Sequence, residues 1–203
     1  MAAARQLFVD PQRCIGCRAC MQACSECPGH GGTAMIHLDD IARATSVQTA
    51  PTVCMHCAEP ACASVCPADA IKTDADGIVL SASPERCIGC GNCALACPFG
   101  VPKIDPQREL MTKCDLCYDR TSVGKAPMCA TVCPSGALFY GTHEEVEDRR
   151  RARPLHLFAF GAHEVVTRNA LMVPSATSLL ELGAPDAMAR SRAELQLEEA
   201  LCD

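Results

Sequence analysis

Cysteine is the residue in this chain best suited to chemistry, and its spacing is regular. The sequence holds 18 cysteines in 203 residues, a density typical of disulfide scaffolds or metal proteins. Sixteen of them form four motifs, in each of which a Cys-x2-Cys pair is followed by a Cys-x3-Cys pair. The motifs are, in chain order, Cys14, Cys17, Cys20 and Cys24; Cys54, Cys57, Cys62 and Cys66; Cys87, Cys90, Cys93 and Cys97; and Cys114, Cys117, Cys129 and Cys133.

This spacing favours iron–sulfur clusters over zinc. Three cysteines two residues apart, as in motifs one and three, let one loop present three thiolates to three irons of a cubic [4Fe–4S] cluster. Small residues such as Gly16, Gly89 and Gly91 let that loop pass close by. Zinc knuckles also use Cys-x2-Cys pairs, but they rarely use so tight a run, and no motif has a ligand-spaced His pair. We therefore expect four [4Fe–4S] clusters, all cubanes with four irons.

Other chemistries have weaker support in the sequence. Cys20, Cys24 and Cys27 have the spacing of radical S-adenosylmethionine enzymes, but the rest of the chain is too short for the barrel those enzymes need. No His pairs with a Cys or Ser as a nucleophile would require, and no phosphate-binding loop is present. His56, between two cysteines, would either hydrogen-bond a cluster or simply pack or face solvent. We therefore predict no catalytic residue.

Composition limits the partners and the location. The formal net charge is −6, and four clusters would add roughly −8 by formal charge counting, so nucleic acid and anionic membrane are disfavoured as partners. No apolar run is long enough to cross a bilayer, and residues 1–10 do not resemble a secretion signal. We expect a cytoplasmic protein, or alternatively one exported in folded form with a signal-bearing partner.

The chain repeats itself, and the repeats predict an α+β fold. Residues 13–24 recur as residues 86–97, and residues 66–71 loosely match residues 133–138, so two kinds of unit alternate. Short β-like stretches and turn-forming residues separate the units. We expect short strands, short helices and long cluster-binding loops.

A boundary is expected where the cysteine motifs end. We predict a cluster domain over residues 1–141 and a C-terminal region over residues 142–203. In that region, residues 155–166 alternate apolar and polar around Gly161-Ala162, as a β-hairpin would. An Ala-, Leu- and Glu-rich tail follows from Pro174.

Three segments carry a family resemblance. Residues 54–71, 76–79 and 113–120 resemble the four-cluster electron-transfer (beta) subunits of the dimethyl sulfoxide reductase group of molybdopterin oxidoreductases. The resemblance covers residues 5–141. It implies tandem units like bacterial ferredoxins, in which motif one pairs with motif four and motif two with motif three. The repeat itself would equally permit pairing one with two and three with four.

The resemblance also implies four sets of ligands, one set for each cluster. Motif one leaves one choice open, because Cys24 is followed by Ser, whereas Cys27 is followed by Pro and lies three residues further on. We expect Cys24 to be the ligand and keep Cys27 as the alternative. The sets are Cys14, Cys17, Cys20 and Cys133 at site 1; Cys114, Cys117, Cys129 and Cys24 at site 2; Cys54, Cys57, Cys62 and Cys97 at site 3; and Cys87, Cys90, Cys93 and Cys66 at site 4.

The function implied by the resemblance is electron transfer without catalysis. Such a subunit would relay electrons between a molybdopterin-containing (Mo or W) catalytic subunit and a further redox subunit or carrier. The alternative is a free-standing polyferredoxin that serves several enzymes. The segment beyond Tyr140 favours a fixed partner, and we expect the hairpin and the tail to dock on it. The reason is that apolar hairpin residues such as Phe158 and Phe160 have little surrounding sequence to bury them.

Overall fold

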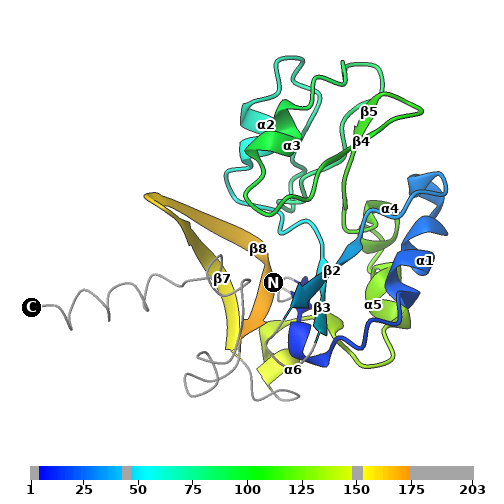
Figure 1. The fold of residues 1–203 in the computed structure, drawn as a ribbon, viewed down its shortest axis with the longest axis vertical. Coiled ribbons are helices and arrows are strands. Elements are labelled where there is room, and N and C mark those ends of the chain that lie inside the picture. The colour runs from blue at the N-terminus through cyan, green and yellow to red at the C-terminus, as the bar shows by residue number, and fades with distance from the viewer. Residues whose placement is uncertain (1–4, 43–46, 148–152, 174–203) are drawn as a thin grey trace, which may run out of the picture.

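The computed structural model describes residues 5–42, 47–147 and 153–173 and combines short helices with small β-sheets (Figure 1). This confirms the α+β class. One half of the molecule, at the top of Figure 1, contains α2, α3, β4 and β5, and the other half contains α1, α5, β2 and β3. The helices are α1 (Ala19–Ser25), α2 (Ala61–Ser64), α3 (Asn92–Ala96), α4 (Tyr118–Thr121), α5 (Met128–Val132) and α6 (His143–Glu147), with 3-10 turns at Pro11–Arg13 and Pro28–His30.

The strands form three separate sheets. A four-stranded sheet has the order β6-β1-β8-β7, while β2 pairs with β3 and β4 pairs with β5. The strands are β1 (Gln6–Val9), β2 (His37–Ala42), β3 (Val47–Thr52), β4 (Lys103–Asp105), β5 (Leu110–Thr112), β6 (Leu138–Gly141), β7 (Arg153–Phe160) and β8 (His163–Val173).

Four of the helices contain the first cysteine of a Cys-x3-Cys pair, and α1 contains both. Cys20 and Cys24 both lie in α1, while Cys62, Cys93 and Cys129 lie in α2, α3 and α5. In motifs two to four a proline follows the last cysteine and biases that cysteine away from helix. These helices have seven residues or fewer, too few to be stable alone. Packing must therefore hold them in place.

Strand β1 is the centre of the largest sheet. It pairs antiparallel with β6 and parallel with β8, so both ends of the cysteine region and the C-terminal hairpin meet on it. Leu7 and Phe8 are fully buried on its two faces: Leu7 packs with several cysteines, whereas Phe8 packs with Val146 and Ala170. Because both faces of this strand are buried, it links the cysteine-bearing helices to the C-terminal part of the chain.

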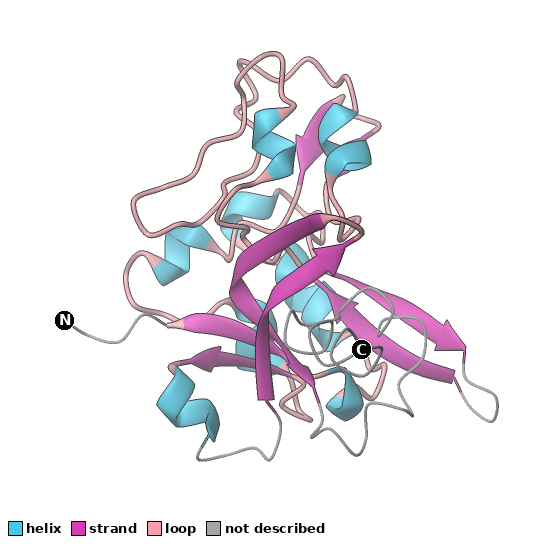
Figure 2. Ribbon diagram, turned by 90° about the vertical axis from the view of Figure 1, so that its left-hand side faces the viewer, coloured by secondary structure: helices cyan, strands magenta, loops and turns pink. Residues whose placement is uncertain are grey.

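The predicted C-terminal hairpin is present, as β7 and β8 joined by a two-residue turn. Gly161 has a φ of +61° in that turn, a conformation that glycine adopts without strain. In Figure 2 the hairpin lies on the side of the molecule nearest the viewer, in front of the middle of the molecule. The hairpin does not need a partner to bury Phe158, which is 2% exposed and packs edge-on against Phe99 of this chain. Our expectation that such residues lack surrounding sequence was wrong for Phe158.

Two expectations about the C-terminal region are not tested by the structure. The tail from residue 174 onward lies outside the described residues, so its docking stays a prediction, as does the domain boundary near residue 141.

Among the helices that the structure describes, none has the length and apolar character needed to cross a membrane.

Candidate metal centres

The four Cys-x2-Cys pairs share one backbone feature. In each pair, the residue just before the second cysteine has a positive φ: +69° at Gly16, +48° at His56, +66° at Gly89 and +62° at Leu116. A Cβ at Gly89 would lie 2.5 Å from the Glu109 carbonyl oxygen, so this position also needs a glycine for space. The left-handed conformation is costly for Leu and His. Its recurrence at all four pairs indicates that the same tight turn is built four times.

The Cys-x3-Cys helices lie in two pairs. Helix α1 of motif one packs against α5 of motif four, and α2 of motif two packs against α3 of motif three. Of the two pairings that the sequence repeat permits, this is the nested one.

The thiols of site 1 line one pocket together. All four of its cysteines contribute, with Leu38 and Pro51 from the β2–β3 hairpin on another wall. The thiol of Cys14 also lies 3.1 Å from the Thr49 hydroxyl on β3. Cys17 is exposed and Cys20 is buried, while the other two are intermediate.

The thiols of site 4 line a second pocket in the same way. Here the small hairpin is β4–β5, whose cross-strand neighbours Ile104 and Met111 form the wall. Cys90 is exposed, Cys93 is buried and the other two cysteines are intermediate. Sites 1 and 4 therefore match in their ligand positions, their hairpin wall and their pattern of exposure.

Sites 2 and 3 lie deeper. All four site 2 cysteines are buried, and site 3 has two buried and two intermediate ones. Burial first, and then the other three thiols of site 3, raise the pKa of Cys57 to about 12. Burial also raises the pKa of Cys129, and the other thiols of site 2 and that of Cys20 add to the rise. Thiols with raised pKa values are protonated near neutral pH, so metal binding must release protons.

Known proteins share these motifs. Residues 45–143 match the 4Fe–4S dicluster domain family and residues 5–26 match a 4Fe–4S binding domain family. The chain is 38% identical over 162 residues to the formate dehydrogenase-O iron–sulfur subunit of Escherichia coli K12, a match covering 69% of this chain and 54% of that relative. It is 34% identical over 160 residues to a probable anaerobic dimethyl sulfoxide reductase chain of the same organism, covering 70% of this chain and 75% of the relative. The chain belongs to the iron–sulfur (beta) subunit family of the dimethyl sulfoxide reductase group.

The extent of the match differs among the relatives of this beta-subunit family. A formate dehydrogenase iron–sulfur subunit of Haemophilus influenzae is 39% identical over 166 residues, covering 69% of this chain and 52% of the relative. The chain thus spans about half the length of the formate dehydrogenase subunits that it matches. The matched domain families confirm 4Fe–4S binding, which the cysteine spacing had predicted, and the relatives confirm the family that the sequence resembles.

Backbone N–H groups of this beta subunit suit thiolate ligands. Such groups donate to the sulfurs of four cysteines, two of site 2 and two of site 4. The donors are Met35 to Cys24 at 3.2 Å, Leu116 to Cys114 at 3.4 Å, Ala70 to Cys66 at 3.3 Å and Met111 to Cys87 at 3.5 Å. Donors aimed at sulfur stabilise a thiolate, so this donor set fits iron–sulfur clusters.

A buried lysine lies between sites 2 and 3. Lys113 is 1% exposed, and its ammonium group donates to the carbonyls of Val79 and Cys114 and lies 3.7 Å from the Cys54 sulfur. These three acceptors match the three donors of an ammonium group. Cys54 belongs to site 3 and Cys114 to site 2, so one positive charge faces ligands of both sites. The sequence analysis missed this role, because a lysine beside a cysteine is not by itself a signal.

His56 is buried, and its ring leaves one donor to spare. Its Nδ1 accepts the Val79 N–H at 3.0 Å, whereas Nε2 is buried without a partner among the described residues. Burial, helped by Lys113 and Arg168, lowers the pKa of His56 well below its usual value, so the ring is neutral and Nε2 carries the proton. A buried N–H group needs a hydrogen-bond acceptor, and beside two cysteines of site 3 a sulfide of a bound cluster would be a suitable one. Of the two alternatives for His56, this favours the hydrogen bond.

Strand β8 holds the loop that contains the first two cysteines of site 3. Asn169 is fully buried, donates to the Cys54 carbonyl at 2.8 Å and accepts the Leu7 N–H at 3.0 Å. Backbone bonds join the same strand to Met55, His56 and Ala58. The C-terminal hairpin therefore supports a cysteine loop of this chain, which the sequence analysis did not foresee.

Cys24 and Cys27 are both buried near motif four. Cys24 is among the thiols that add to the effect of burial in raising the pKa of Cys129, whereas Cys27 adds to the effect of burial in raising the pKa of Cys117. Which of the two is the cluster ligand stays a prediction, with Cys24 preferred. Cys202, the last cysteine, lies outside the described residues.

Proposed function

We propose that this chain is an electron-transfer subunit that holds four [4Fe–4S] clusters in a row and makes or breaks no substrate bond itself. The observation that carries the proposal is the graded burial of four groups of four thiols. Two groups expose one cysteine each, whereas the two groups between them have no exposed cysteine, and in one of these all four are buried. A series of clusters with accessible ends and an insulated middle is suited to passing electrons through a protein.

The proposed ligand sets are sites 1 to 4, and they pair as two tandem ferredoxin-like units. The support is the joint lining of two pockets by the thiols of sites 1 and 4 and the mutual pKa effects within sites 2 and 3. The contacts of α1 with α5 and of α2 with α3 favour the nested pairing. In bacterial ferredoxins the last cysteine of one motif likewise binds the other cluster of the pair.

Electrostatic effects and helix contacts between neighbouring sites support an order for the row. Cys20 of site 1 raises the pKa of Cys129 of site 2. Cys54 of site 3, after burial, raises the pKa of Cys114 of site 2 to about 12. Sites 3 and 4 share the packed helices α2 and α3. The proposed path therefore runs from site 1 through sites 2 and 3 to site 4, or in the reverse direction.

Apolar side chains mark the two ends of this path. Ile15, between Cys14 and Cys17, is 67% exposed, and Ile88, at the equivalent place in site 4, is 68% exposed. Leu95 on α3 is 88% exposed. Exposed apolar residues beside a cluster ligand are suited to close contact with another protein.

The proposed partners follow from the family. One end would face a molybdopterin-containing catalytic subunit and the other a further redox subunit or carrier, because relatives are named as subunits of formate dehydrogenase and dimethyl sulfoxide reductase. A cytoplasmic location, or export in folded form with a partner, is part of the same proposal. A free-standing polyferredoxin is the second candidate, since two accessible ends would also serve a shuttle.

Metal analysis and gentle purification test the proposal together. Anaerobically prepared protein should contain about sixteen irons and about sixteen sulfides per chain, and a molybdenum- or tungsten-containing chain should co-purify with it. About eight irons, or stoichiometric zinc, in a fully folded protein would contradict the four-cluster proposal. A full iron content with no such partner would favour the polyferredoxin.

A further inference from the structure

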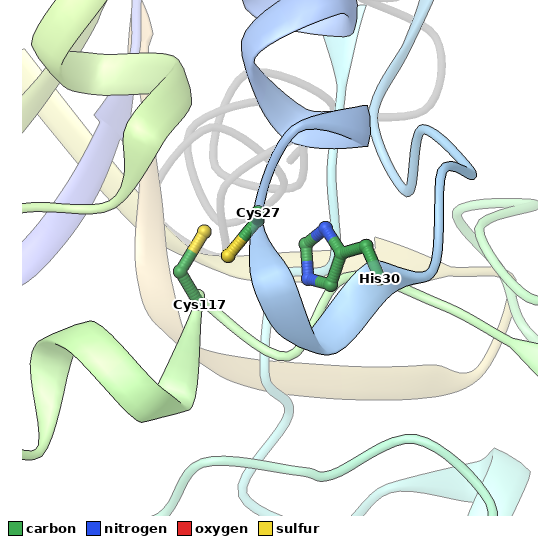
Figure 3. A group of neighbouring side chains, drawn as sticks. All are labelled: Cys27, His30 and Cys117. Carbon is green, nitrogen blue, oxygen red and sulfur yellow. The ribbon is translucent and has the colours of Figure 1, made fainter.

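Site 2 has a fifth thiol, that of Cys27. Cys27 is 1% exposed, and its sulfur, the Cys117 sulfur and a ring nitrogen of His30 all lie within 4.8 Å of one another. Figure 3 shows the two cysteine side chains extending toward each other, with the His30 ring on the Cys27 side. Cys27 comes from the turn after α1, while Cys117 directly precedes α4.

His30 is already engaged and is a poor metal ligand in this group. Its Nε2 lies 3.0 Å from Asp115 Oδ1, and its Nδ1 lies 2.7 Å from the Cys24 carbonyl oxygen and 3.3 Å from the Cys24 sulfur. Both ring nitrogens therefore already have hydrogen-bond partners and are not free for a metal. The pair able to bind iron is therefore Cys27 and Cys117.

The thiol of Cys27 has a hydrogen-bond partner on α4, close to Cys117. Its sulfur donates to Asp119 Oδ1 at 3.6 Å, and Asp119 lies on α4, two residues beyond Cys117. This contact keeps the Cys27 side chain directed at motif four. Among the described cysteines, Cys27 is the one that the four proposed ligand sets do not use, so no other site has a comparable fifth thiol in the part of the chain that the structure describes.

We propose that Cys27 is a reserve ligand, able to replace Cys117 on the iron that Cys117 holds at site 2. In the exchange, the bond from Cys117 sulfur to iron breaks and a bond from Cys27 sulfur to the same iron forms. The proton of the Cys27 thiol passes to the released Cys117 thiolate, and no electron is transferred. The inference rests on the proposed cluster at site 2. Its consequence is that site 2 tolerates loss of one ligand, whereas the other sites do not.

Two alanine variants at matched positions test this directly. Cys117 and Cys57 are each the second cysteine of a Cys-x2-Cys pair at an inner site, and alanine cannot bind iron. We expect Cys57→Ala to lose iron and to show the electron paramagnetic resonance signal of a three-iron cluster. We expect Cys117→Ala to keep about sixteen irons without that signal, and Cys117→Ala combined with Cys27→Ser to behave like Cys57→Ala.

The outcomes separate this inference from the function it rests on. A three-iron signal in Cys117→Ala equal to that of the double variant would overturn the reserve role while the four clusters stand. Fewer than about sixteen irons in the unchanged protein would instead contradict the four-cluster proposal.

A second measurement uses a variant that keeps all sixteen proposed ligands. Loaded Cys27→Ser and unchanged protein are treated with an iron chelator, and iron release is followed over time. We expect one cluster to release its iron several-fold faster in Cys27→Ser, because a transiently released site 2 iron can no longer be recaptured. Equal release curves would overturn the inference, even if Cys117→Ala fails to fold.

Discussion

The two end sites and the two inner sites use the same motifs in opposite surroundings. Sites 1 and 4 each lie beside a small hairpin and expose one cysteine, with an exposed isoleucine next to it. Sites 2 and 3 are surrounded by buried polar groups, above all Lys113 and Asn169. The difference teaches that one repeated motif can be solvent-exposed or buried, depending on what packs around it, and the proposed function assigns contact with partners to the first and insulation to the second.

The polar groups at the inner sites show why their burial is tolerated. A buried cluster with four thiolates brings negative charge into the interior, which is costly without compensation. Lys113 offers a positive charge to ligands of both inner sites, and His56 offers an N–H that lacks another partner in the described chain. The end sites obtain part of this compensation from solvent instead.

The largest expected effect comes from removing the C-terminal hairpin, because β8 holds the site 3 loop. A chain ending at Val173 should keep about sixteen irons, whereas a chain ending at Tyr140 should lose at least the four irons of site 3. Iron content and circular dichroism would measure this. If the chain ending at Tyr140 kept all of its iron, the hairpin would be dispensable for the inner sites.

A chelator should distinguish end sites from inner sites in the unchanged protein. We expect iron to leave in two phases, with about eight irons from sites 1 and 4 released first. The fold should persist through the first phase and be lost in the second, because the inner sites are more buried and metal binding contributes folding free energy. Release of all iron in a single phase would contradict the comparison.

A substitution that leaves every cysteine in place should still destabilise site 3, by removing the hydrogen bonds that hold its loop. Asn169→Ala would leave the Leu7 N–H and the Cys54 carbonyl without their present partner, at a cost of about 1–3 kcal/mol for each group. The unfolding temperature of the loaded protein should fall, and site 3 iron should be released sooner. His163→Ala, at the exposed end of the same strand, is the control and should change neither quantity.

The smallest effect is expected on reduction potential. Lys113→Met removes the positive charge facing both inner sites, so an inner cluster should become harder to reduce, by on the order of 100 mV for about 2 kcal/mol of lost interaction. Redox titration followed by electron paramagnetic resonance would measure the shift. Lys103→Met on β4, where the lysine is exposed, should leave the inner potentials unchanged. A Lys113→Met protein with unshifted potentials would show that the lysine serves packing only.

The sequence was most informative where a ligand pattern is local. The spacing and the small residues predicted loops that pass close to a cluster, and Gly16, Gly89 and Gly91 all have a positive φ in the structure, whereas the same conformation at His56 and Leu116 was not foreseen. The hairpin around Gly161 was predicted for the same reason, since turn chemistry and alternation are encoded by neighbouring residues. The family resemblance added the nested pairing, which repeats within the chain left open.

The sequence was least informative where distant residues meet. Nothing near Phe8 indicates that β1 pairs in parallel with β8, which lies more than 150 residues away, at Ala170. For that reason the hydrogen bond from Asn169 to the Cys54 carbonyl could not be predicted from the sequence. Phe158 was wrongly expected to lack residues that cover it, because Phe99 is distant in the sequence. In the sequence, Lys113 is only the residue before Cys114 in a segment that resembles the family. Its burial between sites 2 and 3 is what reveals that its charge faces both sites.

The central claim is that four clusters form one row with buried inner members and exposed ends. The most direct measurement is diffraction at the iron absorption edge from anaerobically grown crystals. We expect four iron cubanes in the order of sites 1 to 4, held by the sixteen cysteines assigned above, with Cys27 beside Cys117 but not bound in the unchanged protein. Fewer than four cubanes, zinc in place of iron, or ligands paired between motifs one and two would contradict the account.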